Sequence, residues 1–90
     1  MERITRKRDD GTYVAPESAV RAEADGYSGE AIERLAAFEN AIEVVEAQIA
    51  SIEPRLDELK ARGRIRGSEA QQLLAQKLAC ASTLHMLGVD

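Results

Sequence analysis

The sequence has few of the residues from which a large hydrophobic core is built. Of its 90 residues only three are aromatic and none is tryptophan, and alanine makes up 15 of the 40 apolar residues. A chain this short buries only about 60–65% of the surface that it exposes when unfolded, so its core is thin. Partner chains are the usual source of the missing stability, and we therefore expect a homo-oligomer.

Disulfides, membrane spans and targeting segments are also missing. One cysteine, Cys80, excludes an internal disulfide framework and fits a reducing compartment. No run of apolar residues is long enough to cross a membrane. The basic residues of segment 1–8 lead into Asp9-Asp10-Gly11 rather than into the apolar run of a secretory signal. We expect a soluble, cytoplasmic protein with no membrane partner.

The charges are segregated along the chain. Residues 1–8 carry four bases and one acid, residues 17–53 nine acids and two bases, and residues 60–66 four bases and no acid. Separate zones of opposite sign let a chain pair with its own copies or present its basic segments to an anionic partner. The net charge of −4 opposes general nucleic-acid binding, because proteins with that role are usually basic.

Residues 1–28 are expected to form an N-terminal β-hairpin and a linker. Ile4–Arg8 and Thr12–Ala15 flank Asp9-Asp10-Gly11, where the Asp-Gly pair supplies the positive φ that a tight hairpin turn needs. Residues 16–28 leave two alternatives open, a short helix that begins at Pro16 and ends near Ala24, or a mobile linker.

Residues 29–62 have the clearest periodicity. Ser28 is predicted to cap a helix whose apolar residues recur at alternating spacings of three and four. They are Leu35, Phe38, Ile42, Val45, Ile49, Ile52, Leu56 and Leu59. The stripe requires a helical partner, and its residues from Leu35 to Ile52 are predicted to form the oligomer interface. Pro54 lies opposite the stripe, so we expect one continuous, kinked helix.

A second helix follows a short connection. Gly63 is predicted to end the first helix, and Ser68 to open the second through a capping box with Gln71. The second helix has a broad apolar face, and the short connection makes the two helices antiparallel neighbours. Residues 29–90 are therefore an antiparallel helical hairpin, and the fold class is mainly α.

The connection is the first candidate site. Arg62, Arg64 and Arg66 lie between the end of one helix and the start of the next, where Ser68 and Glu69 bring free backbone amides. Guanidinium groups and a helix N-terminus together suit an anion such as phosphate or a nucleotide. The simpler alternative is that these cations stabilise the C-terminal end of the first helix and are otherwise solvated.

The N-terminal strand is the second candidate site. Strand alternation places Arg6 and Arg8 on one face, and Tyr13 on the return strand offers a ring for stacking. The alternative is that the positive charges protect an exposed strand edge from aggregation.

The remaining reactive residues do not form a catalytic or metal-binding pattern. Cys80 and His85 are five residues apart on one helix, whereas ligand pairs on a helix are three or four apart. The glutamates at 39, 46 and 53 occupy flanking heptad positions, where charged residues are usually solvated. We expect no enzymatic activity, no metal and no cofactor.

Two fragments resemble small phage and prophage proteins. One joins the opening Met1-Glu-Arg-Ile-Thr and the Arg8-Asp-Asp-Gly11 turn to Ile32-Glu-Arg-Leu-Ala-Ala-Phe-Glu39, which is similar to an "ERLAAYE" helix. The other runs from Glu58-Leu-Lys-Ala-Arg-Gly63 to Gln71-Gln-Leu-Leu-Ala-Gln-Lys-Leu78 and resembles "ELKAQGK…QQLLAQKL". The resemblance covers about half the chain and implies a phage context, in which proteins of this size often inhibit bacterial immunity.

Three functions follow as hypotheses. The first is a non-enzymatic phage-type binding protein that acts in the host cytoplasm and counters a defence system, by sequestering a phosphate-bearing nucleotide signal or by occupying a host defence protein. The second is a structural or adaptor coiled coil with only protein partners. The third is a nucleic-acid-binding regulator.

Overall fold

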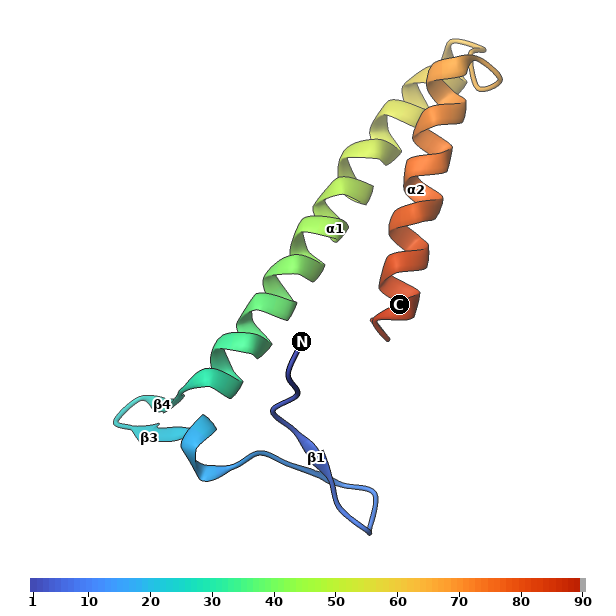
Figure 1. Cartoon of the computed structure of the whole chain (residues 1–90). Coiled ribbons are helices and arrows are strands. Elements are labelled where there is room, and N and C mark those ends of the chain that lie inside the picture. Colours follow the sequence, from blue (N-terminus) through green and yellow to red (C-terminus); the bar gives the residue numbers. More distant parts are fainter. Residues whose placement is uncertain (90) are drawn as a thin grey trace. The chain divides into compact units, whose positions relative to one another are not determined.

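The computed structural model describes residues 1–89 and is mainly helical, which confirms the expected fold class. Its elements are β1 (Arg6–Lys7), β2 (Tyr13–Val14), the 3-10 helix η1 (Glu17–Ala19), β3 (Arg21–Glu23), β4 (Gly26–Ser28), α1 (Glu30–Ala61) and α2 (Ser68–Met86) (Figure 1). The chain forms two compact units that meet within α1, the first ending at residue 39 and the second beginning at residue 40.

The predicted N-terminal hairpin is present, with shorter strands than expected. Strand β1 pairs antiparallel with β2, so that Arg6 lies opposite Val14 and Lys7 opposite Tyr13. Gly11 has a φ of +88° and donates its N–H to the carbonyl of Arg8 at 3.0 Å, which closes the turn. The positive φ expected of the Asp-Gly pair is therefore found at its glycine.

Both expectations for residues 16–28 were wrong, because this stretch forms a second hairpin. A single 3-10 turn follows Pro16, and β3 then pairs antiparallel with β4. Gly26, with a φ of +145°, lets the chain reverse directly after Asp25. Glu23 stabilises the hairpin by accepting hydrogen bonds from Arg21 Nε at 2.7 Å and from the Ser28 hydroxyl at 3.1 Å.

Helix α1 begins one residue later than its predicted cap implies. Its first backbone hydrogen bond runs from the Glu33 N–H to the carbonyl of Gly29 at 3.0 Å, so Gly29 is the N-cap residue. Ser28 was the wrong cap because its hydroxyl is bonded to Glu23 in the second hairpin. From there α1 is one continuous helix of 32 residues, about 48 Å long, with the exposed Pro54 inside it, as expected.

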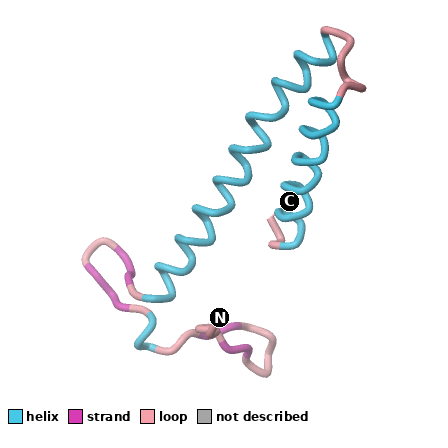
Figure 2. Tube along the Cα trace, turned by 45° about the horizontal axis from the view of Figure 1, so that its top comes forward, coloured by secondary structure: helices cyan, strands magenta, loops and turns pink. Residues whose placement is uncertain are grey.

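Helix α2 packs against α1 in the second unit and completes the predicted helical hairpin (Figure 2). The core is one small cluster at the closed end, made of Ile52, Leu56, Leu59 and Ala70, with Ile65 and Leu73 packed against it. Gly63 ends α1 as predicted, with a φ of +70°. The N–H of Gly63 bonds to the carbonyl of Lys60, and that of Arg64 to the carbonyl of Leu59, which is a Schellman motif.

The junction between the second hairpin and α1 generates the first prediction. Gly29 has a φ of +120°, and a Cβ at this position would lie 2.5 Å from the carbonyl oxygen of Ala19. Gly11 also has a positive φ, but a Cβ there would meet no atom within 4 Å. Gly29→Ala should therefore destabilise the protein by more than the roughly 1–3 kcal/mol of backbone strain expected for Gly11→Ala.

The measurement is urea denaturation of both variants, together with amide exchange of residues 20–29. Gly29→Ala should lower the denaturation midpoint further than Gly11→Ala and lower protection in the second hairpin. Equal midpoints for the two variants would show that the close approach of residue 29 to Ala19 does not exist in solution.

Candidate functional site

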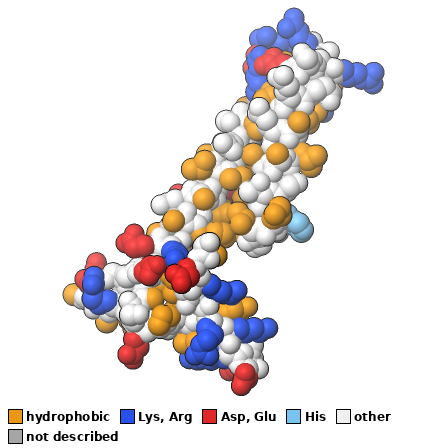
Figure 3. All heavy atoms as spheres, viewed as in Figure 1, with side chains coloured by type: hydrophobic (Ala, Val, Ile, Leu, Met, Phe, Trp, Pro, Cys, Tyr) orange, Lys and Arg blue, Asp and Glu red, His pale blue; other side chains and the backbone are white. Residues whose placement is uncertain are grey.

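The candidate site is the connection between α1 and α2 with the first turn of α2, residues 62–69, which we call the Arg turn. The Schellman motif at Gly63 holds its start, and a hydrogen bond from the Gly67 N–H to the carbonyl of Arg64 at 3.1 Å closes the loop. Lys and Arg side chains gather at this end of the second unit (Figure 3). The backbone of the turn is thus fixed by the end of one helix and the start of the next.

Two of the predicted site residues are already engaged within the chain. The Arg62 guanidinium pairs with Glu58 at 2.9 Å. The Glu69 carboxylate accepts two hydrogen bonds from Arg55, from Nε at 2.8 Å and from a terminal nitrogen at 3.1 Å. Because Arg55 also pairs with Glu58 at 2.9 Å, these four side chains form one ion-pair network across the two helices.

The network sets the ionisation of its members. The Arg55 guanidinium holds the pKa of Glu69 below its ordinary value, chiefly through the side-chain hydrogen bonds, and the charges of Arg64 and Arg62 act in the same direction. The two carboxylates in turn raise the pKa of Arg55. At neutral pH the carboxylate of Glu69 is therefore charged, and its charge is largely compensated by Arg55.

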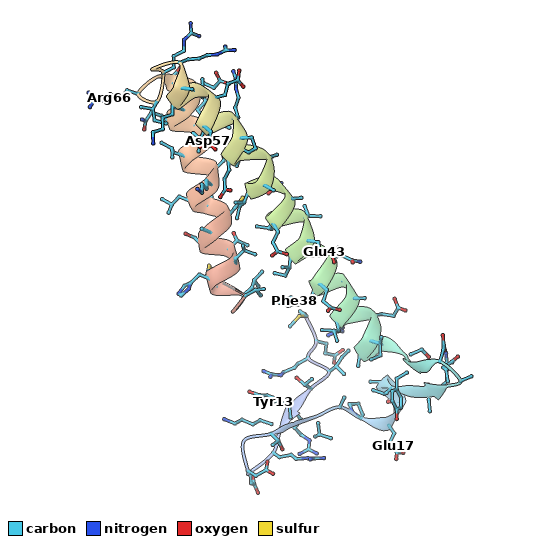
Figure 4. All side chains as sticks on the ribbon, turned by 180° about the vertical axis from the view of Figure 1, so that it is seen from behind. Tyr13, Glu17, Phe38, Glu43, Asp57 and Arg66 are labelled. Carbon is cyan, nitrogen blue, oxygen red and sulfur yellow. The ribbon has the colours of Figure 1, made fainter. Side chains whose placement is uncertain are left out.

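Arg64 and Arg66 differ from Arg62 because neither takes part in a salt bridge within residues 1–89. Figure 4 shows Arg66 projecting away from both helices. A shallow hollow of about 440 Å³ lies beside Arg64, and Leu59, Gly67 and Ser68 also line it. The turn therefore brings one unpaired guanidinium group, that of Arg64, next to a surface depression, and leaves Arg66 exposed.

Ser68 lies in this hollow but does not cap α2 as predicted. It is the first helical residue, and the N-cap position belongs to Gly67, whose φ of −73° and ψ of 168° are extended. No side-chain hydrogen bond caps this helix end, so the expected capping box with Gln71 was wrong. The backbone instead enters the helix through a bond from the Gln71 N–H to the carbonyl of Gly67.

The second candidate site is divided between two faces of the first hairpin. Paired residues of an antiparallel ladder share a face, so Tyr13 lies with Lys7, and Arg6 lies with Val14. The Tyr13 ring is covered by the guanidinium of Arg3, which lies 5.5 Å from the ring centroid. Tyr13 and Arg6 are therefore not brought together on one face for a stacked ligand.

Arg8 belongs to the turn of the same hairpin rather than to either strand. Its N–H donates to the carbonyl of Thr12 at 2.7 Å. Within the turn the backbone N–H and the hydroxyl of Thr12 both donate to Asp10 Oδ1, at 2.9 and 2.6 Å. These bonds hold the pKa of Asp10 below its ordinary value, with the hydroxyl as the main cause.

The stripe predicted as the oligomer interface is covered unequally in the single chain. Ile42 and Ile52 are buried, and Val45 and Ile49 are half-buried. Leu35 and Phe38, near the start of α1, are 53% and 40% exposed. The first two residues of the stripe are thus the ones that remain open to a partner.

The structure also places one residue that the sequence analysis overlooked. Arg55 of α1 joins the two helices through its hydrogen bonds to Glu69 of α2. Its spacing of three from Glu58 was a visible signal for an ion pair on the helix surface. The longer-range contact with Glu69 depends on how the two helices align, which no local pattern reveals.

Cys80 contacts α1 rather than a second reactive group. Its half-buried thiol lies 3.5 Å from Gln48 Oε1, across the interface of the two helices. This contact makes Cys80 part of the packing between the two helices.

Comparisons with known proteins add no identification. No family model, no curated protein and no solved structure matches the chain. Neither helix of the described residues has an apolar stretch long enough to cross a membrane.

The ion-pair network generates the second prediction. In Arg55→Gln the pKa of Glu69 should rise toward its ordinary value of 4.5, because the hydrogen bonds that favour the carboxylate are removed. A lowered carboxylate pKa stabilises the fold above the unfolded-state pKa, and this stability is lost as the pH falls below about 4.5. The wild type should therefore lose more stability on acidification than Arg55→Gln.

The pKa is measured by NMR titration of the Glu69 side-chain carboxyl, and the stability by urea denaturation at neutral and acid pH. The Asp10 carboxyl serves as the internal control, because its pKa depends on Thr12 and should not change. An unchanged Glu69 pKa in Arg55→Gln would contradict the bidentate pair.

Proposed function

We propose that the protein is a non-enzymatic, homo-oligomeric binding protein that captures a phosphate-bearing ligand, a nucleotide above all, at the Arg turn. The observation that carries this proposal is the guanidinium group of Arg64, which lines a hollow and forms no salt bridge within residues 1–89, with the equally unpaired Arg66 two residues further along the same turn. Guanidinium groups stay charged at every physiological pH and bind phosphate oxygens in a bidentate manner.

The surroundings of the hollow favour an anion. The first turn of α2 begins at Ser68, so its unbonded backbone amides and the positive end of the helix dipole lie at the hollow. Glu69 is the one carboxylate that lines the hollow, and Arg55 compensates its charge.

The biological context of the proposal comes from the resemblance to small phage proteins. A phage protein that binds a nucleotide without transforming it would lower the concentration of a defence signal in the host cytoplasm. The proposed role is therefore counter-defence by sequestration.

A second candidate function is an adaptor, or an inhibitor that occupies a host protein, with protein partners only. The observation that favours it is the exposure of large apolar side chains on α2, with Leu74 at 40% and Leu78 at 69%. Nucleic-acid regulation is the weakest candidate, because the net charge of −4 opposes it. Retention on a heparin column that weakens with salt is the test for nucleic-acid regulation, because only that function requires such retention.

The third prediction tests ligand capture. Arg64→Ala and Arg66→Ala should each weaken the binding of a nucleotide by about 1.5–3 kcal/mol, because each removes a charge-assisted hydrogen bond. Calorimetric titration with a panel of mono-, di- and cyclic nucleotides measures the affinity. Phage growth in cells with an active signalling defence measures the activity.

Arg21→Ala is the control, because it removes the same charge from an exposed position in the second hairpin. It should leave nucleotide affinity unchanged. If the double variant Arg64→Ala/Arg66→Ala still protects phage fully, the Arg turn is not the functional site, and the adaptor function takes its place.

A further inference from the structure

Helix α2 has a second stripe of exposed residues, apolar at its centre, outside the side that packs against α1. The inner side of α2 carries Ala70 and Leu73, which belong to the hairpin core or pack on it. The next residues along the helix surface follow the spacings three, four, three and four. They are Gln71, Leu74, Leu78, Ala81 and His85, all exposed, and we call them the outer seam.

The outer seam lies on a helix that is almost without charge. Between Glu69 and His85 the one charged residue is Lys77, and it is paired with Glu53 of α1 at 3.4 Å. Surface helices normally carry charged residues on the side away from the core. A scarcity of charged residues around exposed leucines is instead typical of the centre of a protein interface.

We propose that the outer seam is the self-association surface of this protein, where α2 of a second copy packs antiparallel about a two-fold axis at Leu78. This inference deepens the oligomeric part of the proposed function. In that register Leu78 meets its own copy, Leu74 lies level with Ser82, and Ala81 lies level with Ala75. The large side chain of Leu74 then faces small ones, which is the arrangement that lets two helix surfaces interdigitate.

Electrostatics favour α2 over α1 as the contact between copies. Glu39, Glu43 and Glu46 flank the exposed part of the α1 stripe, near Leu35 and Phe38. Because each copy has a net charge of −4, pairing through α1 brings like charges together. Pairing through the outer seam, which contains no acidic residue, keeps the two acidic helices apart.

Exposed leucines at the centre of the seam supply its apolar surface. Leu74 is 40% and Leu78 is 69% exposed in the single chain. A two-fold arrangement buries the same patch on both copies, so each copy contributes these side chains.

The fourth prediction tests the outer seam in the full chain by sedimentation equilibrium. The wild type should be a dimer at micromolar concentration. Leu78→Asp should raise the dimer dissociation constant about 100-fold or more, because two carboxylates would meet in an apolar contact. Helical circular dichroism should be retained, since Leu78 is exposed in the single chain.

Two substitutions with the same added charge serve as controls. Gln72 is exposed on α2 but lies outside the seam, so Gln72→Asp should leave the dimer intact. Leu35 lies on the exposed part of the α1 stripe, and Leu35→Asp should also leave the dimer intact. A monomeric wild type, or dissociation by Leu35→Asp with none by Leu78→Asp, would overturn the proposal.

Cross-linking tests the antiparallel register. In a Cys80→Ala background, Leu78→Cys should give a covalent dimer with a short bifunctional maleimide, and Gln72→Cys should not. Equal cross-linking at both positions would exclude the two-fold axis at Leu78. Sedimentation and cross-linking report the mass of the assembly and not nucleotide binding. A negative result here therefore contradicts the proposed dimer interface and leaves the proposed ligand site at the Arg turn to be judged by calorimetry.

Discussion

The close approach of α1 and α2 at Ala70 is the constraint on which the second unit depends. Ala70 is completely buried against Ile52, Leu56 and Leu59, so the space between the helices at this point holds only a methyl side chain from α2. Arg55 and Glu69, the sequence neighbours of two of these residues, form the ion pair that joins the helices at the same level. This pair is exposed, and exposed pairs add little stability, so its main effect is to fix the alignment of the helices. The position of the Arg turn follows from that alignment.

A core of this size explains why so much apolar surface remains outside it. No large side chain is completely buried among residues 1–89. Helix α2 has 19 residues and α1 has 32, so the start of α1 extends beyond the reach of its partner and leaves Leu35 exposed. Small domains with thin cores gain stability by association, because the partner buries apolar surface that the chain alone cannot. The outer seam and the short core are therefore two consequences of the same alanine-rich composition.

The parts of the fold that the sequence predicted are those set by local rules. Heptad spacing predicted α1, a broad apolar face predicted α2, and glycines at 11 and 63 have the positive φ that turns and helix ends require. The second hairpin was missed because its strands have three residues each, too few for periodicity to show. The predicted caps Ser28 and Ser68 were wrong because a neighbouring glycine takes the N-cap position in each case. Gly29 follows Ser28 at the start of α1, and Gly67 precedes Ser68 at the start of α2. Arg55 was missed because its partner Glu69 lies 14 residues away, across the connection.

The two proposals constrain one another through geometry. In an antiparallel pairing centred on Leu78, the start of α2 lies ten residues from the axis, which is about 15 Å along the helix. The two Arg turns then lie about 30 Å apart, farther than a mononucleotide or a cyclic dinucleotide can bridge. Each chain must therefore bind its ligand with its own Arg64 and Arg66. In this arrangement dimerisation through the seam stabilises the helical hairpin that presents these residues, but it adds no side chain to the site. Dimerisation therefore changes the ligand affinity of each Arg turn only by stabilising the hairpin. Binding of one ligand per chain, with equal affinity at both turns, is the arrangement in which both proposals hold together.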